Sequence, residues 1–290
     1  MVADWLNLLT DTGRIARVAS LIADSLRLPG LPEGNSFLAK RLIRFVQVHG
    51  LTALDELIDA NRTDRLRSIV GVQNSWFWRE PEHFIFLLGH LETQLRREQP
   101  LRIWSAAASA GQEPYSLAMA FLEATQPKVP AVRILATDLD AAALDLGRRG
   151  VYDAAALTEL PDALSPWLVP APSESGPPGW QVRPEVSQLV EFKSLDLLSP
   201  SWCGDEAPVV LDMGKGLFDA IFCRNVLLYF AAPYRYAVLE GLARRLAPGG
   251  LLCLGQSETL GLAGHLFEPC GRGMYLRPIR TRRTKKEVTE

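Results

Sequence analysis

The 290-residue sequence lacks the features that would place a protein outside the cell or in a membrane. It has four cysteines (Cys203, Cys223, Cys253 and Cys270), and none of them forms a CxxC pair. Cys223 and Cys253 lie in apolar, strand-like runs, so we expect buried thiols in a reducing, cytoplasmic setting. No run of about 18 apolar residues is present, which predicts no membrane span. The N-terminus lacks a basic region followed by an apolar stretch, so we expect no signal peptide.

Strong charge of either sign is also absent. The sequence has 31 basic and 33 acidic residues, and its formal net charge of −2 gives no electrostatic case for binding nucleic acid. The glycine patterns that bind phosphate groups, GxGxxG and GxxxxGK[ST], are missing as well. Hydrophobic residues make up 48%, which is enough for a sizeable core in one large or two modest domains.

The first 85 residues are typical of helices and contain no strand signal. Residues 14–28 carry apolar side chains at helical spacing, and a second helix is expected over 35–50. Thr52 and Thr63 are candidate caps of two further helices. We therefore expect a separate helical domain over residues 1–85.

From about residue 100 onward, short apolar runs alternate with helix-like segments. The expected strands are 101–104, 132–137, 189–192, 218–223 and 251–254. The expected helices are 113–125, 140–149 and 233–246. This alternation predicts a doubly wound, mostly parallel sheet with helices on both faces, over residues 86–279.

Two stretches do not fit the alternation. Proline, glycine and serine crowd the segment before Trp180, which is equally consistent with a surface loop and with a small antiparallel β insertion at about 170–193. The tail at 280–290 is basic and poor in apolar residues, and we expect it to be disordered.

Small residues fill the turn after the first expected strand, from Ala106 to Gly111. Small side chains let a ligand approach the backbone, and the following helix offers free N–H groups. Asp138 and Asp196 end the next two strands, where doubly wound sheets bind ligands. This order predicts a nucleoside-type cofactor whose ribose contacts Asp138. The alternative is a turn packed against its own core, with the aspartates as helix caps.

The turn is a poor site for a pyrophosphate, because it has no Lys or Arg and is followed by the acidic Glu113. S-adenosylmethionine fits better, since it has a ribose without phosphate and a cationic amino group and sulfonium. Arg224 and Asn225 interrupt the end of the strand at 218–223, where polar groups are costly to bury unless paired. Tyr229 is expected near the same strand end. The alternative for Arg224 is that it merely satisfies backbone carbonyls.

Six segments between residues 74 and 260 resemble, in order, the chemoreceptor glutamate methyltransferases of bacterial chemotaxis (CheR-type). The segments are NSWFWREPEHF, IWSAAASAGQEPYSLAM, ATDLDAAALDLGRRGVY, VEFKSLDLL, FDAIFCRNVLLYF and LAPGGLLCLGQSETL. The resemblance implies a class I methyltransferase fold and methyl transfer from S-adenosylmethionine to receptor glutamates, giving methyl esters and S-adenosylhomocysteine. It implies the cytoplasmic helices of a chemoreceptor as partner, a monomer, and no metal, nucleic acid or membrane insertion. Two alternatives remain: a methyltransferase for another protein carboxylate, and a non-catalytic S-adenosylmethionine-binding regulatory module.

The resemblance also implies roles for single residues. Arg79 would face the sulfonium and the incoming carboxylate, with Arg224 and Tyr229 beside the methyl group. Glu113 would lie near the amino group of the cofactor and Asp138 at its ribose. The implied cofactor-binding set is Ser75, Arg79, Ala108, Glu113, Asp138, Asp196, Leu197 and Asn225.

The chain departs from the family pattern at several of these positions. Ser75 stands for a usual Thr, Asp196 for a frequent Asn, Ala110 for a Thr and Gln112 for an acid. In the expected receptor-gripping helix, the basic residues are thinned to Lys40, Arg41 and Arg44, with Phe45 and Gln47 where further basic residues would be expected. Some members bind a receptor's C-terminal peptide on the β insertion, but the irregular PAPSESGPPG segment supports no such expectation here.

Overall fold

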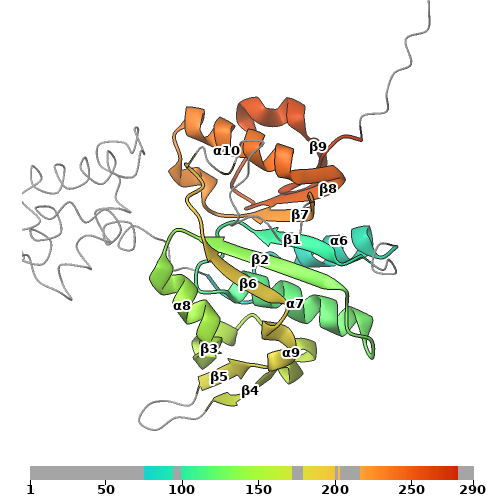
Figure 1. The fold of residues 1–290 in the computed structure, drawn as a ribbon, viewed down its shortest axis with the longest axis vertical. Helices are drawn as coiled ribbons and strands as arrows, with labels where there is room; N and C mark the ends of the chain where they lie inside the picture. The colour runs from blue at the N-terminus through green and yellow to red at the C-terminus, as the bar shows by residue number, and fades with distance from the viewer. Residues whose placement is uncertain (1–74, 94–98, 172–178, 200–201, 203–215, 280–290) are drawn as a thin grey trace, which may run out of the picture.

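The computed structural model describes residues 75–93, 99–171, 179–199, 202 and 216–279. Most of the expected helical domain at 1–85, including Lys40, Arg41 and Arg44, lies outside the described residues, as does the tail at 280–290. The structural account therefore concerns the α/β part of the chain, which is drawn in colour in Figure 1.

A seven-stranded sheet in the order β6-β2-β1-β7-β8-β10-β9 forms the centre of this part. The five strands from β6 to β8 are parallel, and β10 is antiparallel to β8 and β9. This confirms the doubly wound, mostly parallel sheet. The strands are β1 (Leu101–Ser105), β2 (Val132–Asp138), β6 (Val190–Ser194), β7 (Phe218–Cys223), β8 (Leu246–Leu254), β9 (Glu268–Gly271) and β10 (Met274–Leu276).

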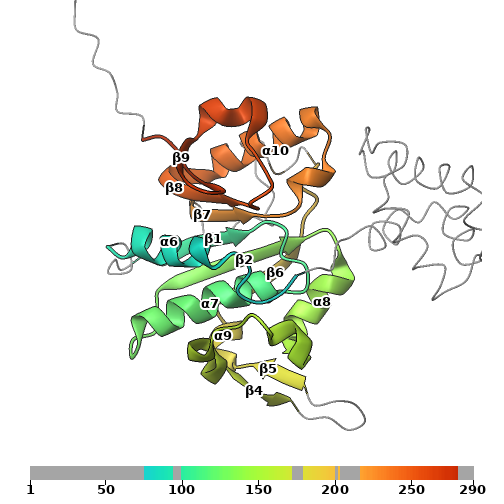
Figure 2. The same cartoon turned by 180° about the vertical axis from the view of Figure 1, so that it is seen from behind.

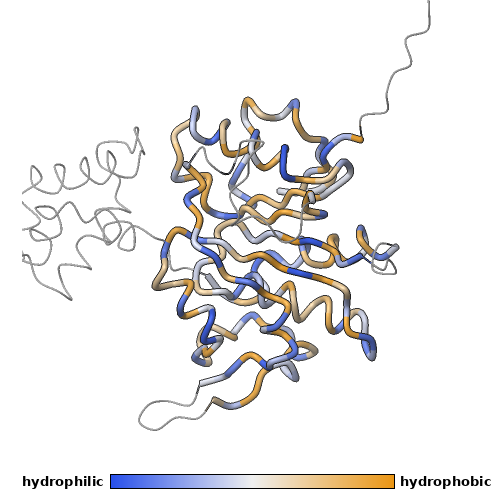
Figure 3. Tube along the Cα trace, viewed as in Figure 1, coloured by the Kyte–Doolittle hydropathy of each residue, from blue (hydrophilic) through white to orange (hydrophobic). Residues whose placement is uncertain are grey.

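Alternate strand residues supply two separate cores, one on each face of the sheet. Ile103 and Phe222 belong to the core shared with α6 and α7, whereas their neighbours Trp104 and Ile221 belong to the core shared with α10 and η6. Much of the tube through these strands is hydrophobic in Figure 3. The helices are α6 (Pro81–Leu91), α7 (Gln112–Thr125), α8 (Ala141–Arg149), α9 (Pro184–Ser187) and α10 (Ala232–Arg245), with 3-10 turns η1 (Ala154–Leu157), η2 (Asp162–Trp167), η5 (Leu227–Tyr229) and η6 (Gly261–Leu266).

A small antiparallel sheet of β3 (Val151–Tyr152), β5 (Gly179–Val182) and β4 (Leu168–Ala171) lies at the opposite end of the molecule from α10 (Figures 1 and 2). This confirms a small antiparallel sheet. The strand β5 and the end of β4 fall within the expected 170–193, whereas β3 lies before that range. Pro184 opens α9 directly after β5 and ends the strand. The next strand, β6, pairs with β2 in the main sheet.

The order in which strands are added to the sheet reverses at β1. It runs outward from β1 to β2 and β6, and then returns to place β7 on the other side of β1. In doubly wound sheets this reversal opens a crevice at the carboxyl ends of the strands. The ends of β1, β2 and β7 therefore form the expected ligand site. Among the described residues, no helix is long and apolar enough to cross a membrane.

Candidate functional site

The turn after β1 is fastened to both neighbouring strands. The Ala106 N–H donates to the Phe222 carbonyl at 2.7 Å, and the Ala108 N–H donates to the Thr137 carbonyl at 2.9 Å. Gly111 then opens α7 with a φ of 93°. The turn thus crosses the reversal point in a fixed position, with its backbone toward the carboxyl ends of the sheet.

Packing explains the glycine of this turn. A Cβ at Gly111 would come within 3.0 Å of the Phe192 ring and the Tyr152 hydroxyl, and within 3.1 Å of the Gly147 backbone. The Tyr152 hydroxyl also donates to the Ala110 carbonyl at 2.7 Å. The alternative raised by the sequence, tight packing against the core, therefore accounts for this end of the turn. Ala106 and Ala108 are buried as well, and the close approach of a ligand to this turn stays a prediction.

Asp138 ends β2 and holds the same turn from the other side. Its carboxylate accepts from the Ser109 N–H at 2.8 Å and the Asp140 N–H at 2.9 Å. Burial raises the pKa of Asp138, although these hydrogen bonds oppose the shift. A carboxylate has about four acceptor positions, so Asp138 keeps capacity for ribose hydroxyls. The helix-capping role falls instead to Asp140, which accepts from the first N–H groups of α8.

Asp196 and Leu197 lie after β6, at the end of the third strand. The Asp196 carboxylate accepts from the Leu198 N–H at 2.9 Å, as in an Asx turn. Leu197 is buried in the core shared with α10, and its carbonyl accepts from the Trp202 indole at 3.0 Å. The capping alternative thus describes part of what Asp196 does, and an adenine contact at this position stays a prediction.

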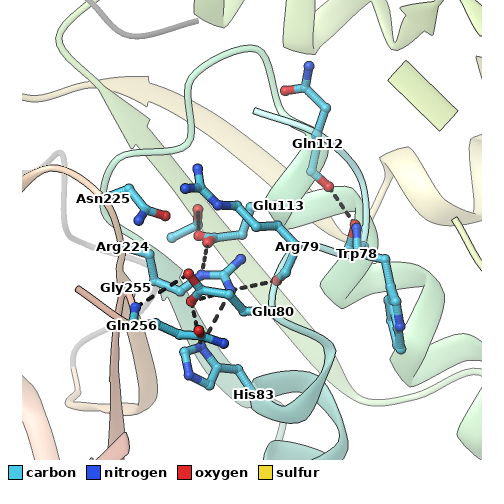
Figure 4. A network of polar contacts seen from close by, with 12 residues as sticks. Trp78, Arg79, Glu80, His83, Gln112, Glu113, Arg224, Asn225, Gly255 and Gln256 are labelled. Atoms are coloured by element: carbon cyan, nitrogen blue, oxygen red, sulfur yellow. Dashed lines mark hydrogen bonds and ion pairs between the residues drawn. The ribbon is translucent and has the colours of Figure 1, made fainter. Parts of the chain in front are cut away.

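Arg224 is the centre of a buried polar network that joins β7 to α6 and α7 (Figure 4). Its Nε donates to Glu113 at 2.6 Å, and its Nη1 donates to the Arg79 carbonyl at 2.6 Å and to Glu80 at 3.4 Å. Burial alone would lower the pKa of Arg224, but the adjacent Glu113 and Glu80 carboxylates together outweigh it and the pKa is raised. Only 3% of the Arg224 side chain is exposed. Arg224 therefore both satisfies a carbonyl, as the sequence alternative held, and binds two carboxylates.

Glu113 links the ends of two neighbouring strands. Its second carboxylate oxygen accepts from the Ser105 hydroxyl, at the end of β1, at 2.6 Å. A Ser–Glu–Arg chain thus runs from β1 to β7 across the reversal point. The sequence predicted that Glu113 and Arg224 share this site, and the structure brings them into direct contact.

Arg79 precedes α6 in a tight turn where Trp78 and Glu80 have positive φ angles of 62° and 57°. Its guanidinium carbon lies 4.3 Å from the ring centroid of Trp76, a cation–π contact, and Trp76 is 36% exposed. Burial, followed by the charge of Arg224, lowers the pKa of Arg79. In Figure 4 the Arg79 side chain extends over Glu113 toward Asn225. The turn therefore aims a cation at the ends of β1 and β7.

Glu258 is a site residue that the sequence reasoning missed. Its buried carboxylate accepts from the N–H groups of Asn225 and Gly255 at 2.7 Å each, and of Leu228 at 3.2 Å. It holds the loop after β7, where Asn225 has a φ of 59°. Burial raises the pKa of Glu258. A lone acid shortly after the apolar run of β8 was the available signal.

His83 is a second residue that was missed. It is fully buried in the first turn of α6, and its two ring nitrogens lie near Arg224 and the Arg272 carbonyl. Its place in the helix-like segment after Arg79 was visible in the sequence, but its partners were not.

Tyr229 and Ser75 border the site from opposite sides. Tyr229 ends the η5 turn that Glu258 holds, and Ser75 precedes the turn that carries Arg79. Both are partly exposed, and their roles stay predictions. Within the described ranges, no cluster of three or more His, Cys, Asp or Glu residues could hold a metal ion.

Comparison with known proteins gives consistent matches over this part of the chain. Residues 73–275 match the family model described as CheR methyltransferase, SAM binding domain. Chemotaxis protein methyltransferase 2 of Pseudomonas aeruginosa is 39% identical over 199 residues, which cover 69% of this chain and 68% of that protein. A chemotaxis protein methyltransferase of Vibrio anguillarum is 37% identical over 233 residues, covering 76% and 79% of the two chains.

Proposed function

Because the chain belongs to the CheR methyltransferase family, and is thus an S-adenosylmethionine-dependent methyltransferase, we propose that it methylates glutamate side chains of a chemoreceptor or related signalling receptor. The observation that supports a carboxylate substrate most directly is Arg79. Its guanidinium is aimed at the strand ends and lies beside the buried Glu113–Arg224 pair. A cation held at this place is suited to orient an incoming carboxylate.

The residues at the strand ends fit the cofactor. Asp138 retains acceptor positions for ribose hydroxyls, and Glu113 offers negative charge for the cationic amino group. Ala108 lets the cofactor approach the backbone of the turn, and we assign Ser75, Asp196, Leu197 and Asn225 to its remaining surface. When bound, S-adenosylmethionine supplies an electrophilic methyl group on a sulfonium.

The proposed reaction needs positioning more than acid–base chemistry. A glutamate carboxylate has an ordinary pKa of about 4.3 and is already a nucleophile at neutral pH. Arg79 and Tyr229 would hold it in line with the methyl group, and such alignment is a large source of rate. Arg224 is enclosed by Glu113, Glu80 and the Arg79 carbonyl, so we assign it to positioning these groups and not to contact with the methyl group.

We extend the proposal to the rest of the chain. The expected helical domain over about 1–85, most of which precedes the matched residues 73–275, would dock the substrate, with Lys40, Arg41 and Arg44 toward the receptor. The partner would be the cytoplasmic helices of the receptor, and the enzyme would act there as a monomer.

The test is methyl transfer to receptor-containing membranes. We expect radiolabelled methyl groups from S-adenosylmethionine to enter the receptor and to leave as methanol after mild base, as glutamate methyl esters do. A receptor in which the acceptor glutamates are replaced by alanine is the control. Cofactor binding by calorimetry without label in any receptor panel would instead favour a regulatory module. Label that base does not release would indicate a different acceptor.

A further inference from the structure

A buried histidine outside the proposed chemistry connects three elements of the site. His83 lies on α6 with none of its surface exposed. Its Nε2 is 3.0 Å from the Arg272 carbonyl in the β9–β10 turn, and its Nδ1 is 3.4 Å from Arg224 Nη1. The turn fits closely around the ring, since a Cβ at Gly273 would come within 3.3 Å of Nε2.

The chemistry of these partners fixes the proton on the ring. A carbonyl oxygen can only accept, so Nε2 must carry the hydrogen that it donates to Arg272. A guanidinium can only donate, so Nδ1 must present a lone pair to Arg224. Both contacts therefore require the neutral Nε2–H tautomer.

We propose that His83 is a positioning residue of the methyltransferase site, which as the neutral Nε2–H tautomer accepts from Arg224 and fixes the guanidinium that holds Glu113 and the Arg79 backbone. Nη1 has two hydrogens. One donates to the Arg79 carbonyl at 2.6 Å, and Glu80 and His83, each at 3.4 Å, share the other. The inference rests on the proposed function only in assigning Glu113 to the cofactor and Arg79 to the substrate.

Charged groups face His83 from each side and determine how it responds to acid. Arg224 approaches from the end of β7, Glu80 Oε2 lies 3.5 Å from Nδ1, and Glu82 is on the same helix. From the β9–β10 turn the facing group is the Arg272 carbonyl. A proton on Nδ1 would oppose Arg224 and turn the ring toward Glu80. Acid should therefore release Arg224 from His83 and loosen its hold on Glu113.

The tautomer can be observed directly by nitrogen-15 NMR of the full chain labelled at histidine. We expect His83 to show the neutral Nε2–H pattern at pH 7 and to stay neutral below the pH at which an exposed histidine protonates. An Nδ1–H pattern or an imidazolium at pH 7 would overturn the proposal. This measurement requires neither methyl transfer nor a receptor, so it stands even if the proposed function fails.

Two substitutions separate positioning from packing. His83→Asn keeps an acceptor near the place of Nδ1 but loses volume, whereas His83→Phe keeps volume but loses the acceptor. We expect His83→Phe to raise the KM for S-adenosylmethionine roughly tenfold or more, as loss of a hydrogen bond to a charged group does, and His83→Asn to raise it less. The opposite order, or equal effects, would mean that His83 only fills space. The exposed His265→Gln variant is the matched control.

Discussion

At the scale of single residues, Arg79 is the side chain that we propose orients the substrate. We expect Arg79→Ala to slow methyl transfer by about 100-fold, because a misplaced reactant can cost that much. Arg79→Lys should recover only part of the rate, since an ammonium lacks the planar fork that binds a carboxylate. The measurements are single-turnover methylation and calorimetric cofactor affinity, and the affinity should change by less than about tenfold.

Arg244→Ala provides a surface control for this substitution. Arg244 forms an exposed ion pair with Glu240 at 3.0 Å, one turn away on α10, and such pairs contribute little. Methylation by Arg79→Ala at the wild-type rate would contradict the role of Arg79 in orienting the substrate.

The Glu258 carboxylate is the acceptor for three backbone N–H groups, those of Asn225, Leu228 and Gly255. Glu258→Ala should lower the free energy of unfolding by about 3 kcal/mol, because each buried donor left unsatisfied costs about 1–3 kcal/mol. Glu258→Gln should cost less, because its amide oxygen can still serve the N–H groups of Asn225 and Gly255. Urea unfolding measures both variants.

The exposed Glu240→Ala change should stay within about 0.5 kcal/mol of the wild type in the same experiment. A similarly small effect for Glu258→Ala would mean that the loop after β7 does not depend on this carboxylate.

At the scale of secondary structure, the five parallel strands were predictable because such strands are short apolar runs, whereas the antiparallel β9 and β10 were not expected. The predicted start of β8 was wrong, because the strand was expected at 251–254 but begins at Leu246. The sequence APGG suggests a turn there, yet the strand continues through an irregularity at which Phe218 pairs with Leu246 and Ala220 with Leu251. β3 has only two residues, too few for a pattern, and is defined by its pairing with β5.

The turn between β1 and α7 can be tested at its glycine. Gly111→Ala should destabilise the protein by about 2–4 kcal/mol for two reasons. Alanine is strained at the left-handed φ of 93°, and its Cβ would lie about 3.0 Å from Phe192 and Tyr152. Thermal and urea unfolding would measure the loss. Gly264→Ala is the matched control, since a Cβ there meets nothing within 4 Å. Equal stability of the two variants would contradict the packing account of this turn.

At the scale of the whole molecule, the polar network makes stability depend on pH. Burial, and next the charge of Arg224, lowers the pKa of His83 below its ordinary value of 6.5. The unfolded chain therefore binds a proton that the folded protein resists, and stability is lost as the pH falls below 6.5 toward the folded pKa. The buried acids Asp138 and Glu258 have raised pKa values, so their contributions change in the opposite sense, with stability lost as the pH rises through those values.

The contribution of His83 can be isolated by difference. The free energy of unfolding of the wild type minus that of His83→Phe should decrease as the pH is lowered from 7 to 5. Urea unfolding at each pH gives this difference, and the exposed His265→Gln variant gives the background. A difference that is flat across this range, or that grows in acid, would contradict the neutral buried histidine.

The candidate site was only partly visible in the sequence. Acids at strand ends and an arginine in an apolar strand can be recognised locally, and Glu113, Asp138 and Arg224 were found in this way. The partners of these residues cannot be recognised locally, because Arg224 binds Glu113 across 111 residues and contacts His83 across 141. Such pairings follow from strand order, which no local periodicity encodes.

These long separations have a consequence for synthesis on the ribosome. Glu80 and Glu113 are made long before Arg224, and the Arg272 carbonyl that accepts the hydrogen bond of His83 comes later still. Every nascent chain that ends before residue 224 thus carries these carboxylates without their cation. The polar network around Arg224 can therefore be completed only when synthesis of the domain is nearly finished.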